Sequence, residues 1–392
     1  MKFLDENIND KRYHYKQCWY FFESIFGDVK LRTTTVFLLA SVVLLNMSGV
    51  SADQAPLLED TQAGSRKVML GQQLFFDVNL SQNRTQSCAS CHAPDKGFSD
   101  HRGSGTALAA SLGADGKSLG DRNAPSASYA AFSPHFQKTP DGIFKGGQFW
   151  DGRANSLAEQ AGGPPLNPGE MGMPDKASVV TRLQENSHYQ EAFKDLYGEA
   201  IFEQVDKAYN AMSDAIEAFE KTEFFSPFDA KYDRYLRGEY QLTSEEDLGR
   251  TLFFSQQFTN CNLCHQLRPI PEQQKETFSN YEFHNIGVPV NSALRTMNGT
   301  TQVDQGLLNH PDVDDIKQRG KFKTPTLRNV AVTGPYMHNG VFTDLRTVVL
   351  FYNKYNSRSV KRQINPETGK QWRQPEILET LSRKELETGP AL

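Results

Sequence analysis

The chain has 392 residues, of which 23% are charged and 38% are hydrophobic, and its formal net charge is −5. This mild excess of acid gives no basic footprint, so we expect no nucleic-acid partner. The length also exceeds what one hydrophobic core usually serves, which argues against a single small domain.

The first element in chain order is an export leader over residues 1–52. Lys30 and Arg32 supply a positive flank, residues 36–45 form an almost unbroken apolar core, and the small residues at 50–52 form a cleavage site. The apolar run is short for a membrane span, which favours a cleaved signal. An uncleaved anchor stays open as the alternative, because the run reaches the lower limit of a spanning helix when it is extended to Val50.

The second feature is a pentapeptide, Cys-x-x-Cys-His, which occurs at 88–92 and again at 261–265 and uses four of the five cysteines. This pattern predicts two covalently attached c-type haems, because each thiol can add to one vinyl group while the adjacent histidine reaches the iron. Cys88, Cys91, Cys261 and Cys264 are then the attachment residues, and His92 and His265 the proximal iron ligands. A zinc site and a thioredoxin-type redox pair are the alternatives. A zinc site requires paired cysteine motifs at a shorter spacing, and a thioredoxin-type pair does not require the histidine.

The two halves also share the string Leu-Gly-x-x-Leu-Phe-Phe ahead of each motif, at 70–76 and 248–254. Its apolar residues recur at helical spacing, so we expect each half to begin with an amphipathic helix that packs against its own porphyrin. An ancestral duplication is the simplest account. We therefore predict an all-α fold with two cytochrome c-like domains, 53–235 and 236–392, each with one covalent haem.

Between the halves, residues 179–196 and 205–220 show three-to-four residue apolar periodicity and are predicted to be helices. Period-two strand patterns are scarce. Stretches rich in Gly and Pro, at 102–125, 139–147 and 162–174, predict long loops, whose order we expect to come from haem contacts.

Residues 1–29 are mixed in charge and rich in Tyr and Phe, which an over-extended start site would explain.

Further strings resemble a known family. The chain carries Phe-Trp-Asp-Gly-Arg-Ala at 149–154, Gln160, Glu170-Met171, and Pro-Tyr-Met-His-Asn-Gly at 335–340. Together with the paired haem motifs, these strings resemble the bacterial dihaem cytochrome c peroxidase and MauG family over residues 60–375. The resemblance implies that Glu170 is the distal acid/base over the first haem, that Gln160 is its neighbour in the peroxide pocket, and that Trp150 relays electrons between the haems.

One departure from the family pattern concerns the first haem. Many peroxidases of the family carry a histidine that caps this haem at rest, but the loop 112–125 contains none. The nearest histidine is His101, which we keep as an alternative ligand. We expect the first haem to be five-coordinate and open, as in MauG.

The resemblance also bears on the second haem and on the bridge between the haems. Tyr352 occupies the position at which other peroxidases of the family carry a methionine ligand, and MauG carries tyrosine there; Met337 is the competing ligand. A phenolate ligand favours oxidised iron. A calcium ion is expected at the side chain of Asn123 and the carbonyls of Thr333 and Pro335. His338, Arg328 and Arg153 are expected to support the haems, as propionate partners or behind other ligands.

These observations predict an exported, periplasmic peroxidase that reduces hydrogen peroxide at the first haem and receives electrons through the second haem from a small cytochrome c or cupredoxin. Covalent haem attachment, usually performed outside the bacterial cytoplasm, agrees with this location. The first alternative is a MauG-like enzyme that oxidises a tryptophan or tyrosine of a partner protein. The second alternative is an electron carrier without catalysis.

Overall fold

The computed structural model describes residues 62–103, 109–257 and 259–387, which lie in one compact unit. The predicted leader and its cleavage site lie outside the described residues and stay predictions. Within the described ranges, no helix combines the length and the hydrophobicity that a membrane crossing requires.

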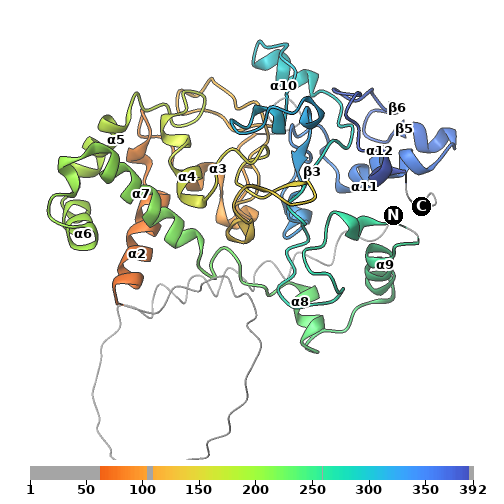
Figure 1. Cartoon of the computed structure of the whole chain (residues 1–392), viewed down its shortest axis with the longest axis horizontal. Helices are drawn as coiled ribbons and strands as arrows, with labels where there is room; N and C mark the ends of the chain where they lie inside the picture. Colours follow the sequence, from red (N-terminus) through yellow and green to blue (C-terminus); the bar gives the residue numbers. More distant parts are fainter. Residues whose placement is uncertain (1–61, 104–108, 258, 388–392) are drawn as a thin grey trace, which may run out of the picture. The chain divides into compact units, whose positions relative to one another are not determined.

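Helices are the main regular structure (Figure 1). The α-helices are α2 (Gln62–Phe76), α3 (Cys88–Cys91), α4 (Leu157–Ala161), α5 (Lys176–Gln184), α6 (Ser187–Tyr197), α7 (Val205–Glu220), α8 (Lys231–Leu236), α9 (Ser244–Phe254), α10 (Ser292–Met297), α11 (Leu345–Asn353) and α12 (Arg383–Leu386). Strands occur as three antiparallel pairs, β1 (Gln137–Lys138) with β2 (Phe144–Lys145), β3 (Phe283–His284) with β4 (Phe322–Lys323), and β5 (Ile364–Asn365) with β6 (Lys370–Gln371). The expected predominance of helix is confirmed, with these short strand pairs added to it.

The core of the first half is the packing of α2 against α7. Leu70, Leu74 and Phe75 of α2 are buried, and Phe75 makes edge-to-face contacts with Phe219 of α7 and with Phe225. The two helices approach so closely at Gly71 that a Cβ there would lie 1.8 Å from the backbone oxygen of Ala215. The glycine of the repeated string is therefore explained in this half by the close helix contact.

The equivalent helix of the second half, α9, forms as predicted but lies differently. It has no buried residue, Leu248 is 58% exposed, and a Cβ on Gly249 would meet nothing within 4 Å. The repeated string thus produces a helix in both halves, while only the first copy contributes to a protein core. The packing of either helix against a porphyrin stays a prediction.

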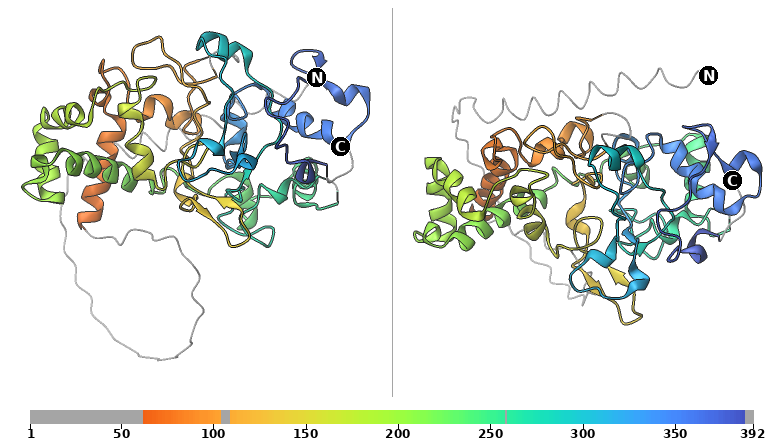
Figure 2. Two further views of the ribbon diagram at one scale, coloured as in Figure 1. Left: turned by 45° about the horizontal axis from the view of Figure 1, so that its top comes forward. Right: turned by 90° about the horizontal axis from the view of Figure 1, so that it is seen from above.

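The helix predicted over 179–196 is interrupted. The structure has α5 and α6 instead, separated at Glu185 and Asn186, because the Asn186 side chain accepts a hydrogen bond from the His188 N–H and caps a new helix. The helix predicted over 205–220 has those bounds as α7. The helices α4 to α7 gather on one side of the described part, and α11 and α12 on the other (Figure 2).

A second cluster joins the two halves, and a third serves the C-terminal half alone. Phe144 packs with Phe283, Leu307 and Val313 in the joining cluster. The C-terminal cluster contains the buried Val288, Val341, Phe342 and Phe351. The halves therefore have separate cores in contact through a small shared one, and the division at residue 235 stays a prediction.

We had expected the long loops to owe their order to haem contacts, but protein contacts also hold them. In the loop 109–125, Gly113 N–H donates to the Ser118 carbonyl at 2.7 Å and Ala114 N–H donates to the Glu170 carbonyl at 2.6 Å. The Asp115 carboxylate accepts from the backbone N–H groups of Lys117 and Ser118. Protein hydrogen bonds thus hold this loop against the segment that carries Glu170.

Candidate functional site

The first Cys-x-x-Cys-His motif begins as the single-turn helix α3, and His92 follows at its end. The His92 N–H donates to the Cys88 carbonyl at 2.9 Å. The His92 Nδ1 lies 3.2 Å from the Phe98 carbonyl. Because a carbonyl only accepts, Nδ1 carries the proton, and Nε2 keeps a lone pair that can bind a metal. Burial lowers the pKa of His92, which favours this neutral form.

The second motif repeats this geometry from a different local structure, the 3₁₀ helix Cys261–Leu263. The His265 N–H donates to the Cys261 carbonyl at 3.0 Å, and Nδ1 lies 3.1 Å from the Phe278 carbonyl. Burial lowers the pKa of His265 to about 4, so its imidazole is also neutral. Both histidines therefore present the same nitrogen, Nε2, to a metal.

A cavity of about 490 Å³ lies over the first motif, within the range of about 300–1,000 Å³ that ligand sites occupy. Cys88, Cys91 and His92 line it, and so do Trp150, Gln160 and Glu170, which the family resemblance had selected. The structure therefore brings all six sequence-predicted residues of the first site together. Residues of the C-terminal half also line it, namely Arg295, Gln302, Val303, Asp304 and Asn309.

These residues fit a covalently attached haem. The four motif cysteines form no disulfide with one another. Burial raises the pKa of the Cys91 thiol to about 11, and it raises the pKa of Cys88 as well, so both stay protonated thiols. Each thiol pair is combined with an imidazole in the iron-binding tautomer. The donor set therefore suits haem at both motifs.

The lining of the cavity includes the Glu170 carboxyl, whose position distal to a haem stays a prediction. Among the described residues that line the cavity, His92 is the only histidine. His101 is exposed, and its Nε2 lies 3.0 Å from the Ser99 hydroxyl. The prediction of an open first haem thus agrees with the placement of these side chains, and the alternative with His101 as ligand gains no support from it.

Local turns position Glu170 and Gln160. Ser156 caps α4 through its side chain, which accepts from Glu159 N–H, and the Gln160 N–H donates to the Ser156 carbonyl. The Glu170 N–H donates to the Asn167 carbonyl at 3.0 Å. Burial raises the pKa of Glu170, although Arg153 and the Asn167 side chain oppose the shift. A carboxyl with a raised pKa can both take and return a proton.

Sequence reasoning missed another carboxyl in this cavity, that of Glu220 at the end of α7. Its side chain is 6% exposed, it lines the cavity, and its Oε2 has no hydrogen-bond partner among the described residues. Burial raises its pKa to about 8, helped by the charge of Glu217, so the carboxyl is mostly protonated at neutral pH. An acid beside Ile216 and Phe219, on the apolar face of a predicted helix, was the signal that could have identified it.

Trp150 lies at the junction of the halves. Its indole Nε1 donates to the Asn123 carbonyl at 2.8 Å, and its own carbonyl accepts from the Lys323 N–H at 2.8 Å. The next residue, Asp151, is 2% exposed and bonds to Arg122 at 2.7 Å and to Arg153 at 2.8 Å. The backbone around Trp150 is therefore held from both halves.

Arg122 completes this junction. Its guanidinium binds both carboxylate oxygens of Asp304 in the C-terminal half, each at 2.7 Å, in addition to Asp151. The Lys323 ammonium donates to the Gly147 carbonyl, and burial lowers its pKa to about 7. Such fully engaged buried charges fix geometry better than they add stability.

The residues expected to hold calcium lie near this junction, but their ligation stays a prediction. The Asn123 side chain donates to the Ala109 carbonyl at 2.8 Å, and the Asn123 N–H donates to the His338 carbonyl at 2.7 Å. Within the described ranges, no cluster of three His, Cys, Asp or Glu side chains could hold a metal. A site built from Asn123 and backbone carbonyls of Thr333 and Pro335 is of another kind.

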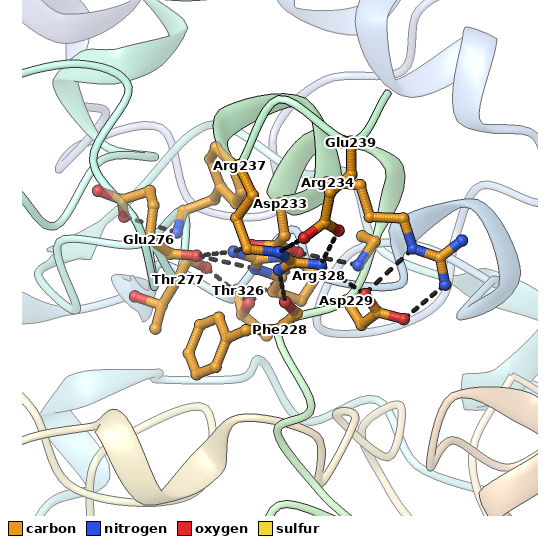
Figure 3. A network of polar contacts seen from close by, with 12 residues as sticks. Phe228, Asp229, Asp233, Arg234, Arg237, Glu239, Glu276, Thr277, Thr326 and Arg328 are labelled. Atoms are coloured by element: carbon orange, nitrogen blue, oxygen red, sulfur yellow. Dashed lines mark hydrogen bonds and ion pairs between the residues drawn. The ribbon is translucent and has the colours of Figure 1, made fainter. Parts of the chain in front are cut away.

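All three expected supporting residues contact other side chains of the protein, and Arg153 does so through its ion pair with Asp151 at 2.8 Å. Arg328 is 4% exposed and binds Asp233 through two nitrogens and the Glu276 carbonyl through Nε at 2.8 Å (Figure 3). His338 stacks on Phe322 at 3.5 Å between ring centroids, and burial lowers its pKa to about 3. The support of the haems by Arg328 stays a prediction.

Tyr352 lies on α11 beside the second motif. Burial and then the neighbouring thiols of Cys264 and Cys261 raise the pKa of its phenol. Met337, the competing ligand, packs against the C-terminal cluster of Val288, Val341, Phe342 and Phe351. The choice between Tyr352 and Met337 as ligand stays a prediction.

Comparisons with known proteins agree with this arrangement. Residues 65–241 match the family model described as di-haem cytochrome c peroxidase. The chain is 49% identical over 353 residues to the methylamine utilization protein MauG of Paracoccus denitrificans, covering 90% of this chain and 89% of the relative. It is 31% identical over 301 residues to the cytochrome c peroxidase Ccp of Escherichia coli, covering 76% of this chain and 56% of the relative.

The fold is shared with a solved enzyme. The crystal structure of the diheme peroxidase BthA from Burkholderia thailandensis matches with a TM-score of 0.68 and 28% sequence identity, over 83% of this chain and 86% of that one. Two haem motifs, one cavity with a distal carboxyl, and these likenesses in sequence and in fold lead to one conclusion. The chain belongs to the dihaem cytochrome c peroxidase and MauG family of oxidoreductases.

Proposed function

We propose that this protein uses hydrogen peroxide at the first haem and delivers the two oxidising equivalents, through the second haem, to an aromatic side chain of a partner protein. The observation that carries the proposal is the cavity over the first motif, which combines one histidine, His92, with the distal residues Glu170 and Gln160. Haem supplies the iron at which peroxide is reduced. The protein residues supply proton transfer, orientation and a route for electrons.

Glu170 handles the proton in this proposal. Its carboxylate accepts a proton from hydrogen peroxide and returns it to the departing oxygen, so that peroxide, two protons and two electrons give two water molecules. Burial raises the pKa of Glu170, which makes the return of the proton easier than from an ordinary glutamate. Gln160, held on α4, donates to or accepts from the bound oxidant without changing charge.

Trp150 is proposed as the electron relay between the haems. It lines the cavity of the first motif, and its backbone and indole are bonded to both halves. A relay must keep a fixed position, because electron transfer depends steeply on distance, and the charges around Asp151 hold its segment in place. Tyr352, beside Cys261 and Cys264, is proposed as the second ligand of the second haem, where a phenolate favours oxidised iron.

The experiment that tests the proposal mixes the fully ferric protein with one equivalent of hydrogen peroxide in the absence of any reductant. We expect immediate spectral changes at both haems. When a partner protein is added, these changes should decay, and mass spectrometry should then find oxidised aromatic residues in the partner. Reactivity that begins only after one-electron reduction of the second haem would contradict this proposal and support the donor-dependent enzyme.

The donor-dependent peroxidase is the second candidate. In it, a small cytochrome c or cupredoxin supplies electrons to the second haem, and water is the only product. Likeness to the Escherichia coli peroxidase and to BthA favours it. Steady-state oxidation of reduced cytochrome c by peroxide measures it directly. In either case we propose a periplasmic location, from the predicted leader, and a calcium ion at Asn123, Thr333 and Pro335.

A further inference from the structure

The two proximal histidines are held by loops of different length. His92 bonds to the carbonyl of Phe98, six residues later, and a tight turn closes this loop through Phe98 N–H to the Ala93 carbonyl at 2.9 Å and Ala93 N–H to the Ser99 carbonyl at 3.3 Å. His265 bonds to the carbonyl of Phe278, which is thirteen residues later. A loop of that length needs some other device to hold its far end against the histidine.

Glu276 provides this device. Its side chain is 3% exposed. Its Oε1 accepts from the backbone N–H groups of Leu267 and Phe278, both at 2.8 Å, and its Oε2 accepts from the N–H of Arg268 at 3.0 Å. One buried carboxylate therefore joins the segment directly after His265 to the residue whose carbonyl holds the His265 imidazole.

The backbone around Glu276 is itself anchored. The Arg328 guanidinium donates to the Glu276 carbonyl through two nitrogens and is held in place by Asp233 of α8 (Figure 3). On the far side of Phe278, the Ser279 hydroxyl donates to the Thr324 carbonyl at 2.7 Å, and the Asn280 N–H donates to the Cys264 carbonyl at 2.8 Å. The Phe278 carbonyl is therefore fixed on both sides along the chain.

We propose that Glu276 is a positioning residue for the second haem, whose carboxylate clips the two ends of the loop 266–278 together and so fixes the hydrogen bond that the His265 imidazole donates to the Phe278 carbonyl. This inference rests on the proposed ligation of the second haem by His265. A fixed acceptor at Nδ1 strengthens the imidazole as an electron donor. Loss of the clip therefore raises the reduction potential of the second haem and leaves the first haem unchanged, because the short turn at Phe98 does not use a carboxylate.

The experiment uses the holoprotein and four variants. Glu276→Ala removes all three acceptor contacts, whereas Glu276→Gln keeps an oxygen for the contacts at Oε1 and loses the one at Oε2. We expect the potential of the second haem to rise in the order parent, Gln variant, Ala variant, with the same order of change in its low-spin electron paramagnetic resonance signal. The first haem in each sample is the internal control.

Glu272→Gln is the matched control, since Glu272 lies in the same loop but is exposed and pairs with Arg250. It is expected to leave both potentials at the parent values. If the Ala variant does not fold, the Gln variant alone still tests the idea, because it retains most of the contacts. A Gln variant with parental potential and signal for the second haem overturns the proposal.

Failure of the clip and failure of the ligation are separable. His265→Ala tests the ligation. A low-spin signal of the second haem that survives this change shows that His265 is not the ligand, and Glu276 then has no iron ligand to position. If His265→Ala abolishes the signal while Glu276→Gln and Glu276→Ala both leave it intact, His265 is the ligand and Glu276 serves the loop alone.

Discussion

The indole of Trp150 donates a hydrogen bond to the backbone carbonyl of Asn123 at 2.8 Å, and the Asn123 N–H in turn donates to the His338 carbonyl at 2.7 Å. This chain of two bonds connects the cavity of the first motif to the C-terminal half. A substitution of Trp150 is therefore expected to weaken the contact between the halves.

Trp150→Phe tests this relationship. The smaller ring keeps an aromatic surface but leaves the Asn123 carbonyl without its donor, so we expect a loss of about 1–2 kcal/mol in the free energy of unfolding. We also expect the response of the second haem to peroxide to be lost while the first haem still reacts. Denaturant unfolding and stopped-flow spectra measure the two effects, and a second haem that responds as fast as in the parent shows that Trp150 is no relay.

Glu170→Gln is expected to slow the reaction with peroxide by roughly 10²-fold, the usual contribution of a positioned acid/base, without changing the haem content. Glu191→Gln, on the exposed face of α6, is the control. Stopped-flow traces of the Glu170 variant that match the parent would make Glu170 an ordinary loop residue.

The same carboxyl sets a pH dependence. Burial raises the pKa of Glu170, and the proton-accepting form is the carboxylate, so the rate falls as the pH drops through a value above the ordinary pKa of 4.5. We expect Glu170→Gln to remove this acid limb of the pH profile. An unchanged limb assigns it to another group.

The absence of a second histidine from the described lining of the first cavity predicts one high-spin and one low-spin ferric haem in the purified protein. Electron paramagnetic resonance measures this, and His101→Ala is expected to leave the spectrum unchanged. Two low-spin signals in the parent, with one converted to high spin by His101→Ala, would identify His101 as a cap on the first haem.

Tyr352→His is expected to remove the long-lived oxidised state that the ferric protein forms with peroxide, because imidazole stabilises oxidised iron less than phenolate does. Met337→Leu is the control for the competing ligand. If the Met337 variant changes the spectrum of the second haem and the Tyr352 variant does not, the assignment of the ligand is reversed.

Glu220→Gln is expected to stabilise the protein at neutral pH. Burial raises the pKa of Glu220 from an ordinary value of 4.5 to about 8 in the folded state, so folding favours the protonated carboxyl. Its stabilising contribution is complete below pH 4.5 and is lost as the pH rises through about 8. At pH 7 the uncharged variant gains about 3 kcal/mol, and at pH 4 it gains almost nothing. Urea midpoints at both pH values measure this, with Glu223→Gln as the exposed control.

Short-range chemistry explains what could be predicted from sequence. The histidine of each motif must follow the second cysteine directly, so the attachment residues could be identified from the motif. Apolar periodicity alone predicted α7 with its bounds. Glu170, in a turn rich in Pro and Gly, carried no such signal, and only the family resemblance selected it. The break between α5 and α6 was missed because apolar spacing outweighed the capping side chain of Asn186 in the prediction.

Contacts between distant segments were decided by the tertiary structure alone. Glu276 reads as one more charged residue in a polar loop, and its role emerges when folding buries its carboxylate against three backbone N–H groups. The same holds for Arg122, which meets Asp151 and Asp304 only in the folded chain. The sequence by itself determined the two haem motifs and the helix α7, because these depend on neighbours within a few residues, whereas burial and pairing over long separations depend on how the whole chain packs.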